Sequence, residues 1–459
     1  MTIFNLTPYK HLLPAYGELR VQENRTRNII IMDGKITKNE VGSKKGLSAR
    51  VLSGGIMGFA ASETISESEV KKVLEKAKRN ADYLKPFEKN TQGALQFNPF
   101  QHSMDLSTKK SLRSTSEILR FLMEVDAYIA KTYPDLKSRM VRLIELDMEK
   151  DLINTPGSVL YSLWTRSHIY IRMIKEKDGI PYSYYEILGG AGDFEDHFEK
   201  PEDLYPTVDL AYKRLVDKTE AVEAKAGMAD VIIGSELTGI LAHEAVGHTA
   251  EADTVLSGSF IGHLVGQQVA NEKVSLVDFA NTYNGELLAM PVFIDDEGTK
   301  AEDAVIIENG ILKGFMHNLQ SAEKLGVKPT GNARAFDFFD EPLIRMRNTA
   351  ILPGKDKIED MIASIENGYY IMSSSNGQAD STGEFMFGVQ LGYEIKNGKL
   401  GRALKETTVS GMAFDVLKST TMLADDLQFF NNGYCGKKQM MPTADGGPTL
   451  KCRMNIGGN

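Results

Sequence analysis

Apolar positions in the first 190 residues change between two spacings, which predicts helices and strands in turn. Across 70–77 they recur at intervals of three and four, so the stretch "SESEVKKVLEKAKRNADYL" is predicted to form an amphipathic helix with Ser66 as its N-cap. A longer helix is predicted over 108–133, and β-prone runs predict strands over 140–187. This region is therefore expected to be an antiparallel meander backed by helices.

Four dipeptides between β-prone runs predict tight turns: Asp33-Gly34, Asp178-Gly179, Asn309-Gly310 and Asn397-Gly398. Both central residues of a type I′ hairpin turn need positive φ, which glycine adopts freely and Asn or Asp tolerates. The last two pairs make the C-terminal half strand-rich. The predicted fold class is α+β, with an N-terminal mixed domain built on an antiparallel sheet and a strand-rich C-terminal domain that carries one functional helix.

With 459 residues, the chain exceeds the size of one ordinary hydrophobic core. We expect an N-terminal domain over 1–200, with a further division near residue 105 left open, a connecting helix over 201–227 and a C-terminal domain over 228–459. The segment 188–206, "LGGAGDFEDHFEKPEDLYP", combines glycines, acids and prolines and is expected to be a boundary or an exposed connection.

Composition narrows the class of protein. Hydrophobic residues make up 42% of the chain and charged residues 25%, as in soluble globular proteins, and no apolar run approaches the eighteen or so residues of a membrane span. The first residues lack the order of a secretory signal, so a cytoplasmic location is expected. A net charge of −9 argues against binding to nucleic acid, which needs a concentrated basic surface.

The stretch "LAHEAVGHTAEAD" (241–253) carries the most specific chemistry. His243, Glu244 and His248 stand in the order of a zinc peptidase, but three residues separate Glu244 from His248 where the familiar H-E-x-x-H has two. In a regular helix, residues five apart lie about 140° apart around the axis, so the two imidazoles would not share a face. The alternative interpretation is a polar stripe on a partly exposed helix, and the pattern alone leaves both open.

A local change of helix geometry would reconcile this spacing with a metal site. One π-type turn realigns position i with i+5, and such turns are common at functional sites. Gly247 precedes the second histidine and makes the backbone permissive there. We therefore expect the backbone between His243 and His248 to depart from α geometry near Gly247.

A catalytic zinc needs a third protein ligand. Two candidates are visible: Glu251, which is local, and Cys435, which lies far along the chain in "NNGYCGKKQMMP". Two imidazoles with either a carboxylate or a thiolate leave the zinc the same net charge, so counting charges does not choose between them. A disulfide between Cys435 and Cys452 is not expected in a cytoplasmic protein.

The complete "HEAVGHTAEAD" resembles the signature of the TldD/PmbA family of metallopeptidases, in particular its catalytic TldD-type branch. The similarity covers essentially the whole chain. It is carried further by "ARVLSGGIMGFAASE", "FIDDEGTKAEDAVIIENGILKGFMHN", "GVKPTGNARAF", "PLIRMRNTAILPG", "GQADSTGEFMFG" and "GGPTLKCRMNIGG". Two departures are "GNARA", where family members often read Gly-Asn-Gly-Arg-Arg, and "CGKKQ", where the glutamine comes one residue early.

The resemblance implies a zinc peptidase with His243, His248 and Cys435 as metal ligands. Glu244 would be the general base that takes a proton from the zinc-bound water and returns it to the leaving amine. Cys452 becomes a packed core residue. The implied substrate is an unfolded or extended peptide, and the implied assembly is a homodimer or a heterodimer with a paralogue that lacks the metal motif.

One alternative comes from a different class of function: a non-catalytic, peptide-binding or scaffolding partner of a related protease complex. The intact Glu244 argues against it, since a purely structural zinc would be closed by four protein ligands and would need no base. No role with nucleic acid or membrane is expected.

Overall fold

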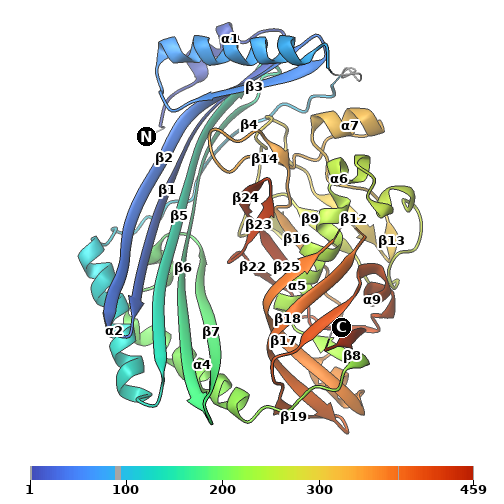
Figure 1. The fold of residues 1–459 in the computed structure, drawn as a ribbon. Coiled ribbons are helices and arrows are strands. Elements are labelled where there is room, and N and C mark those ends of the chain that lie inside the picture. The colour runs from blue at the N-terminus through green and yellow to red at the C-terminus, as the bar shows by residue number, and fades with distance from the viewer. Residues whose placement is uncertain (1–2, 88–94, 381, 458–459) are drawn as a thin grey trace.

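The structure is a computed structural model that describes residues 3–87, 95–380 and 382–457. Figure 1 shows a tall, bent sheet that faces a second, strand-rich part across the molecule. The α+β class predicted from the sequence is confirmed. Within the described residues, none of the helices combines the length and the apolar character needed to cross a bilayer.

The first part is a seven-stranded sheet in the order β3-β2-β1-β5-β6-β4, with β7 also paired to β6. All neighbours are antiparallel except β4 and β6, which confirms the predicted meander. The strands are β1 (Gly17–Met32), β2 (Lys35–Ser53), β3 (Ile56–Ser62), β4 (Gln101–Asp105), β5 (Ser138–Asn154), β6 (Val159–Lys177) and β7 (Ile180–Ala191).

Helices close both ends of this sheet (Figure 1). Helix α1 (Glu67–Leu84) begins at Ser66, whose side chain accepts a hydrogen bond from the Glu69 backbone N–H, as predicted. Helix α2 (Thr115–Thr132) starts seven residues later than the predicted stretch, because Ser114 and Glu117 form a capping box there. The other helical segments of this part are η1 (Thr7–Leu12), α3 (Phe194–His197), η2 (Pro201–Leu204) and α4 (Tyr205–Thr219).

The segment 188–206, predicted to be a boundary or an exposed connection, is exposed only in part. Phe194 and Phe198 are fully buried, and the ring of Phe194 packs edge-on against Phe121 of α2 at 5.2 Å. Aromatic burial outweighs the local glycines and prolines, because each ring removes a large apolar area from water. The segment therefore belongs to the core of the first part.

All four predicted turns are present and have positive φ at both central residues. They join β1 to β2, β6 to β7, β12 to β13 and β18 to β19. In each turn, the φ of the Asp or Asn is between 49° and 53°, and the φ of the glycine is between 71° and 80°. The backbone preference of two residues was sufficient to predict each hairpin.

In the second part, five strands pair in the order β17-β8-β26-β20-β18, and the last strand, β18, also pairs with the first, β17. The five strands therefore form a closed ring. Strands β19 and β21 extend it. The strands are β8 (Gly227–Ile233), β17 (Asn367–Ala379), β18 (Glu384–Lys396), β19 (Lys399–Ala403), β20 (Thr408–Met412), β21 (Met422–Leu423) and β26 (Leu450–Ile456).

A six-stranded sheet in the order β13-β12-β9-β16-β25-β22 lies beside the ring. Its strands are β9 (Leu276–Phe279), β12 (Ala304–Glu308), β13 (Ile311–Leu312), β16 (Asn348–Ile351), β22 (Gln428–Phe430) and β25 (Ala444–Gly447). Three hairpins and three helices complete this part: β10 (Thr282–Tyr283), β11 (Glu286–Leu287), β14 (Ala333–Arg334), β15 (Leu343–Ile344), β23 (Tyr434–Lys437), β24 (Gln439–Pro442), α7 (Leu319–Leu325), α8 (Ile358–Ala363) and α9 (Ala413–Ser419).

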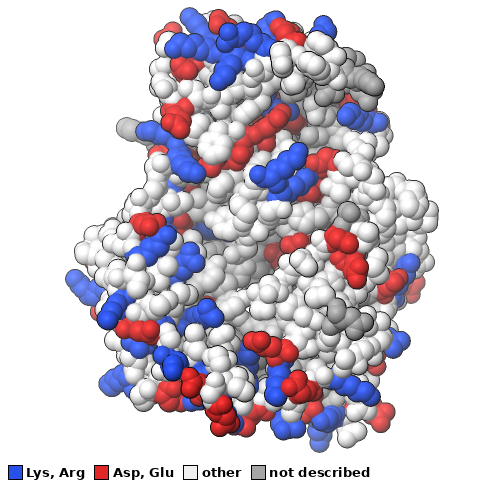
Figure 2. Space-filling model, viewed as in Figure 1, with Lys and Arg blue, Asp and Glu red and all other residues white. Residues whose placement is uncertain are grey.

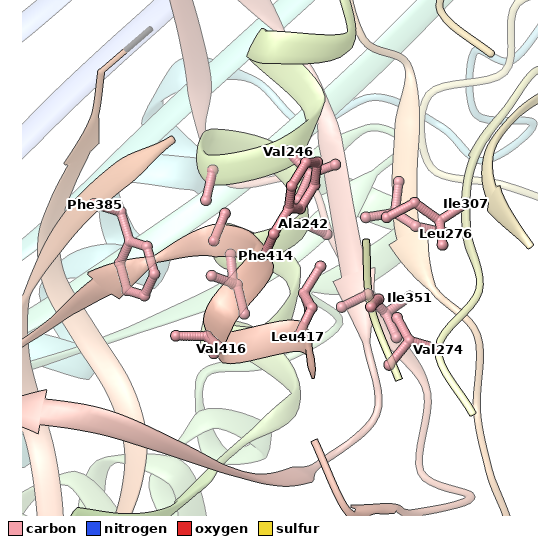
Figure 3. Close-up of a cluster of buried hydrophobic side chains, with 14 of the residues drawn as sticks. Ala242, Val246, Val274, Leu276, Ile307, Ile351, Phe385, Phe414, Val416 and Leu417 are labelled. Carbon is pink, nitrogen blue, oxygen red and sulfur yellow. The ribbon is translucent and has the colours of Figure 1, made fainter. Parts of the chain in front are cut away.

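One helical run follows β8 and packs between the ring and the six-stranded sheet. It consists of α5 (Ser235–Ile240), η3 (Leu241–Gly247), η4 (His248–Ala250) and α6 (Ala252–Leu256), with η5 (Phe260–His263) after it. Figure 3 shows Ala242 and Val246 on this run beside Phe414 and Leu417, all within one buried apolar cluster. This packing holds the run in place, so its other face is free to carry polar side chains.

Buried ion pairs join the two parts. Arg50 of β2 contacts Glu297 at 2.7 Å, and Lys150 of β5 contacts Asp296 at 2.6 Å. Glu297 and Asp296 belong to the loop between β11 and β12. Because breaking one partner would leave a buried charge unpaired, these contacts keep the sheet and the second part in one relative position.

Candidate metal centre

The helical run widens into a π-turn over Leu241–Gly247, and the His248 backbone N–H donates to the carbonyl of His243, five residues back. This bond brings the two histidines onto one side of the run. Their ring centroids lie 5.2 Å apart, with the ring planes nearly perpendicular. The predicted departure from α geometry is confirmed.

The reason for Gly247 differs from the prediction. Its φ of −56° and ψ of −51° are ordinary helical values that any residue adopts. A Cβ at this position would instead lie 2.1 Å from the Sδ atom of Met346. Glycine is therefore needed for close packing against Met346, and backbone freedom plays no part.

Cys435 reaches the two histidines from the β23–β24 hairpin. Its Sγ lies 3.2 Å from Nε2 of His248, and the nearest ligand atoms of His243, His248 and Cys435 all lie within 4.8 Å of one another. His243 and Cys435 are buried, while the side chain of His248 is about one quarter exposed. The structure thus brings together three residues that the resemblance had grouped.

These three side chains shift one another's protonation. Burial raises the pKa of the Cys435 thiol, but the nearby imidazoles of His243 and His248 outweigh burial and bring the pKa to about 5. Burial lowers the pKa of His248, but hydrogen bonds with Cys435 and Glu251 outweigh it and raise the pKa to about 10. The thiolate is therefore favoured, with positive charge held beside it.

The donor set fits a zinc ion. Zinc binds thiolate sulfur and imidazole nitrogen, and a divalent cation can replace the protons that the imidazoles hold beside the thiolate. In addition, Nδ1 of His243 is buried and has no hydrogen-bond partner among the described residues. Two imidazoles and one thiolate, with one imidazole nitrogen lacking a partner among the described residues, are a donor set that a metal would complete.

Glu251, the other candidate ligand, contacts the opposite nitrogen of His248. Its Oε2 lies 3.3 Å from His248 Nδ1 and 2.9 Å from Nζ of Lys437. Burial raises the pKa of Glu251, but His248 and Lys437 outweigh burial and lower it. A carboxylate at Nδ1 orients the ring so that Nε2 faces Cys435, as outer-shell carboxylates do at zinc sites.

Two further basic residues hold the cysteine hairpin, and sequence reasoning did not identify them. Lys437 bridges Glu251 and Asp253, at 2.9 and 2.7 Å. The fully buried Arg345 donates to the backbone carbonyls of Cys435, Lys437 and Gln439. Lys437 lies in the "YCGK" that matched the family motif, so the sequence pointed to this residue. Its contacts with Glu251 and Asp253 could not be predicted from the motif.

The first sheet also positions the hairpin. Arg166 of β6 donates to the carbonyls of Asn431 and Gly433, at 2.7 and 3.1 Å. Its guanidinium lies 4.2 Å from the centroid of the Tyr434 ring, a cation–π distance. The segment that carries Cys435 is therefore held from both parts of the molecule.

The centre opens into a cleft of about 1080 Å³ between the two parts. His243 and Glu244 line it from the helical run, with strands of the first sheet on one side and β17 and β18 on the other. Figure 2 shows the surface hollowed between the two parts. Glu244 is 29% exposed in its side chain, and its Oε2 lies 3.8 Å from His248 Nε2.

Comparison with known families gives two matches. The PmbA/TldA metallopeptidase C-terminal domain matches residues 226–458, and domain 1 of the same family matches residues 17–81. A metalloprotease from Methanocaldococcus jannaschii is 32% identical, covering 98% of this chain and 99% of its own length. A zinc metalloprotease TldD homolog from Saccharolobus solfataricus is 28% identical, covering 91% of each chain.

Solved structures share the fold. TldE from Thermococcus kodakarensis has a TM-score of 0.77 at 17% identity, covering 99% of each chain. A protein from Thermotoga maritima, named as a candidate modulator of a DNA gyrase, also has a TM-score of 0.77, at 21% identity, covering 98% of this chain and all of its own. By family match and by whole-length similarity, the chain belongs to the PmbA/TldD family.

Proposed function

We propose that this chain is a zinc-dependent peptidase, the catalytic TldD-type member of its family, and that it hydrolyses unfolded or extended peptides. The convergence of His243, His248 and Cys435 beside Glu244 at the cleft supports this most. These three residues would hold the zinc, which when bound acidifies water and polarises a carbonyl oxygen. A relative named as a zinc metalloprotease supports the choice of metal.

Glu244 is placed to move a proton. Its carboxylate lines the cleft, and no lysine or arginine among the described residues forms a salt bridge with it. Its one ionic neighbour among the described residues is His248 at 3.8 Å, an imidazole that would be neutral as a metal ligand, so Glu244 would then be available as a base. In the proposed reaction Glu244 accepts the proton of the attacking water and transfers it to the leaving amine.

The cleft supports an extended substrate. Strand β7 presents Ser183, Tyr185 and Ile187, spaced by two, towards it, and β17 and β18 border the other side. A space bounded by strands suits a chain segment in β conformation better than a folded domain. A dimer with a second copy or with a metal-less paralogue is part of this proposal. Light scattering should give about twice the mass of one chain, either for this chain alone or for this chain mixed with the paralogue.

The test is the Glu244→Gln variant. Zinc content should stay at one ion per chain, while kcat/KM for an unstructured, internally quenched peptide should fall about 10²- to 10⁴-fold, because the proton transfer is lost. Glu272→Gln, which removes an exposed carboxylate outside the cleft, should change neither value.

The same experiment separates the peptidase from a non-catalytic, peptide-binding partner. A partner protein would bind the peptide equally well with and without Glu244 and would cleave it in neither form. Wild-type protein that binds peptide but holds no zinc and cleaves nothing would contradict the proposal.

A further inference from the structure

A second cavity adjoins the cleft beside the helical run. Its volume is about 390 Å³, and it shares Glu236, Gln390 and four other lining residues with the cleft. Glu236 lies seven residues before His243, roughly 10 Å along a helix axis, which is about three residues of extended chain. A peptide across the metal centre could therefore place a side chain in this cavity.

The lining has an excess of negative charge, with three carboxylates and one guanidinium. Two of the carboxylates are satisfied: Glu186 pairs with Arg214, and Asp426 accepts hydrogen bonds from Ser235 and Thr449. The third, Glu236, has no hydrogen-bond or salt-bridge partner among the described residues, although it is mostly buried. Its carboxylate thus has no direct partner within the described part of the chain.

The protonation of Glu236 agrees with this geometry. Burial, followed by the charges of Asp445 and Glu186, raises the pKa of Glu236 to about 7. The Arg214 guanidinium is engaged with Glu186 and compensates only in part. Burial and the neighbouring carboxylates disfavour the ionised form of Glu236, and a cation bound beside it would stabilise that form.

The remaining walls suit a long cationic side chain. Tyr185, Tyr370 and Phe430 contribute aromatic rings that can pack against an aliphatic stem and attract a cation. Ser373 also lines the cavity; it is 8% exposed, and its buried Oγ has no partner among the described residues. This hydroxyl is an acceptor to which no donor among the described residues bonds.

We propose that Glu236 makes this cavity a specificity pocket for a lysine or arginine side chain of the peptide substrate. The proposal rests on the peptidase function above and assigns it a substrate class, namely peptides with a basic residue within about three positions of the cleaved bond. A long stem would pack between the rings, and its cationic end would pair with Glu236.

The test uses N-acetylated, internally quenched peptides that differ only in carrying Lys, Gln or Glu at one of the three positions on either side of the cleaved bond. At one position, kcat/KM of the wild type should be about 10- to 100-fold higher for Lys than for Gln. Glu236→Gln should remove this preference, so that the Lys and Gln peptides are cleaved with similar kcat/KM. Glu236→Lys should favour the Glu peptide. Glu272→Gln should keep the wild-type preference.

A second measurement keeps this test independent of catalysis. In the Glu244→Gln background, the fluorescence anisotropy of the same peptides should show tighter binding of the Lys peptide, and Glu236→Gln should abolish the difference. Equal rates and equal binding for Lys and Gln, or a preference that appears only with a free N-terminus, would overturn the pocket. Absence of cleavage with the binding preference intact would overturn the peptidase function alone.

Discussion

The two cysteines of this chain occupy regions that are equally buried and chemically opposite. Cys435 in β23 and Cys452 in β26 are each about 1% exposed. Around Cys452 the apolar core leaves the thiol without compensation, and burial raises its pKa well above the ordinary value. Around Cys435 two imidazoles bring the pKa to about 5. Burial alone therefore does not decide the state of a thiol; the groups within hydrogen-bond distance do.

The histidines repeat the contrast. His248, beside a thiolate and a carboxylate, has its pKa raised to about 10. His168 of β6, beside Arg166 and bonded to the Asn431 amide, has its pKa lowered to about 4, by burial first and then by the positive charge of Arg166. The region around Cys435 thus holds opposite charges together, whereas the surroundings of Cys452 and His168 favour the neutral forms of those side chains.

The largest expected effect is a difference in zinc binding between variants of the two cysteines. Cys435→Ala should weaken zinc binding at least about a thousandfold, because one of the three proposed protein ligands is lost; structural zinc in zinc-finger peptides, for comparison, is bound by roughly 10–16 kcal/mol. Cys452→Ala should keep one zinc per chain. The zinc content of the two variants is measured by mass spectrometry after dialysis. Equal zinc in both would contradict the assignment of Cys435 as a ligand and Cys452 as a core residue.

The carboxylate behind His248 should matter less. Glu251→Gln should lower zinc affinity about 10- to 100-fold, because the negatively charged acceptor that orients the ring of His248 is replaced by a neutral, weaker one. Asp253→Asn is the matched control, since Asp253 contacts Lys437 without a recorded contact to His248. Competition with a zinc-binding dye measures both, and an Asp253 variant weaker than the Glu251 variant would contradict the assignment.

His168 should make stability depend on pH. The pKa of His168 is about 4 in the folded chain and about 6.5 in the unfolded chain. Between these pH values, His168 is protonated in the unfolded chain and stays neutral in the folded chain. The stabilisation is fully present above pH 6.5 and is lost as the pH falls towards 4, by about 2 kcal/mol between pH 7.5 and 5. Urea unfolding at both pH values should show this loss in the wild type and a smaller loss in His168→Gln.

The smallest effect concerns packing at Cys452. Removing its sulfur from a filled core should lower the free energy of unfolding by roughly 1 kcal/mol, a value typical of deleting one buried heavy atom. Thermal unfolding of Cys452→Ala beside Cys452→Val gives the measurement. A loss of zinc in either variant would show that this region is coupled to the metal centre after all.

Local features of the fold were predictable from the sequence because few residues control them. Asp33-Gly34 predicted its hairpin through the φ values of two residues, and Ser66 predicted the start of α1 through one hydrogen bond. The spacing of His243 and His248 predicted the π-turn, because no regular helix satisfies it. The burial of Phe194 and Phe198 within the segment 188–206 was not predicted, because glycines and prolines indicate only the local backbone, while these rings pack against distant residues.

By itself, the sequence determined the α+β class, the hairpins and the need for an irregular turn between two histidines. Residue chemistry left Glu251 and Cys435 equal as third ligands, and only the resemblance favoured the cysteine. The tertiary structure placed Cys435 against a histidine 187 positions away and set Gly247 against Met346. It also placed Glu236 at a cavity without a partner among the described residues. Dihedral preferences and caps act over a few residues, whereas ligand geometry and pocket charge depend on contacts that exist only once the whole chain has folded.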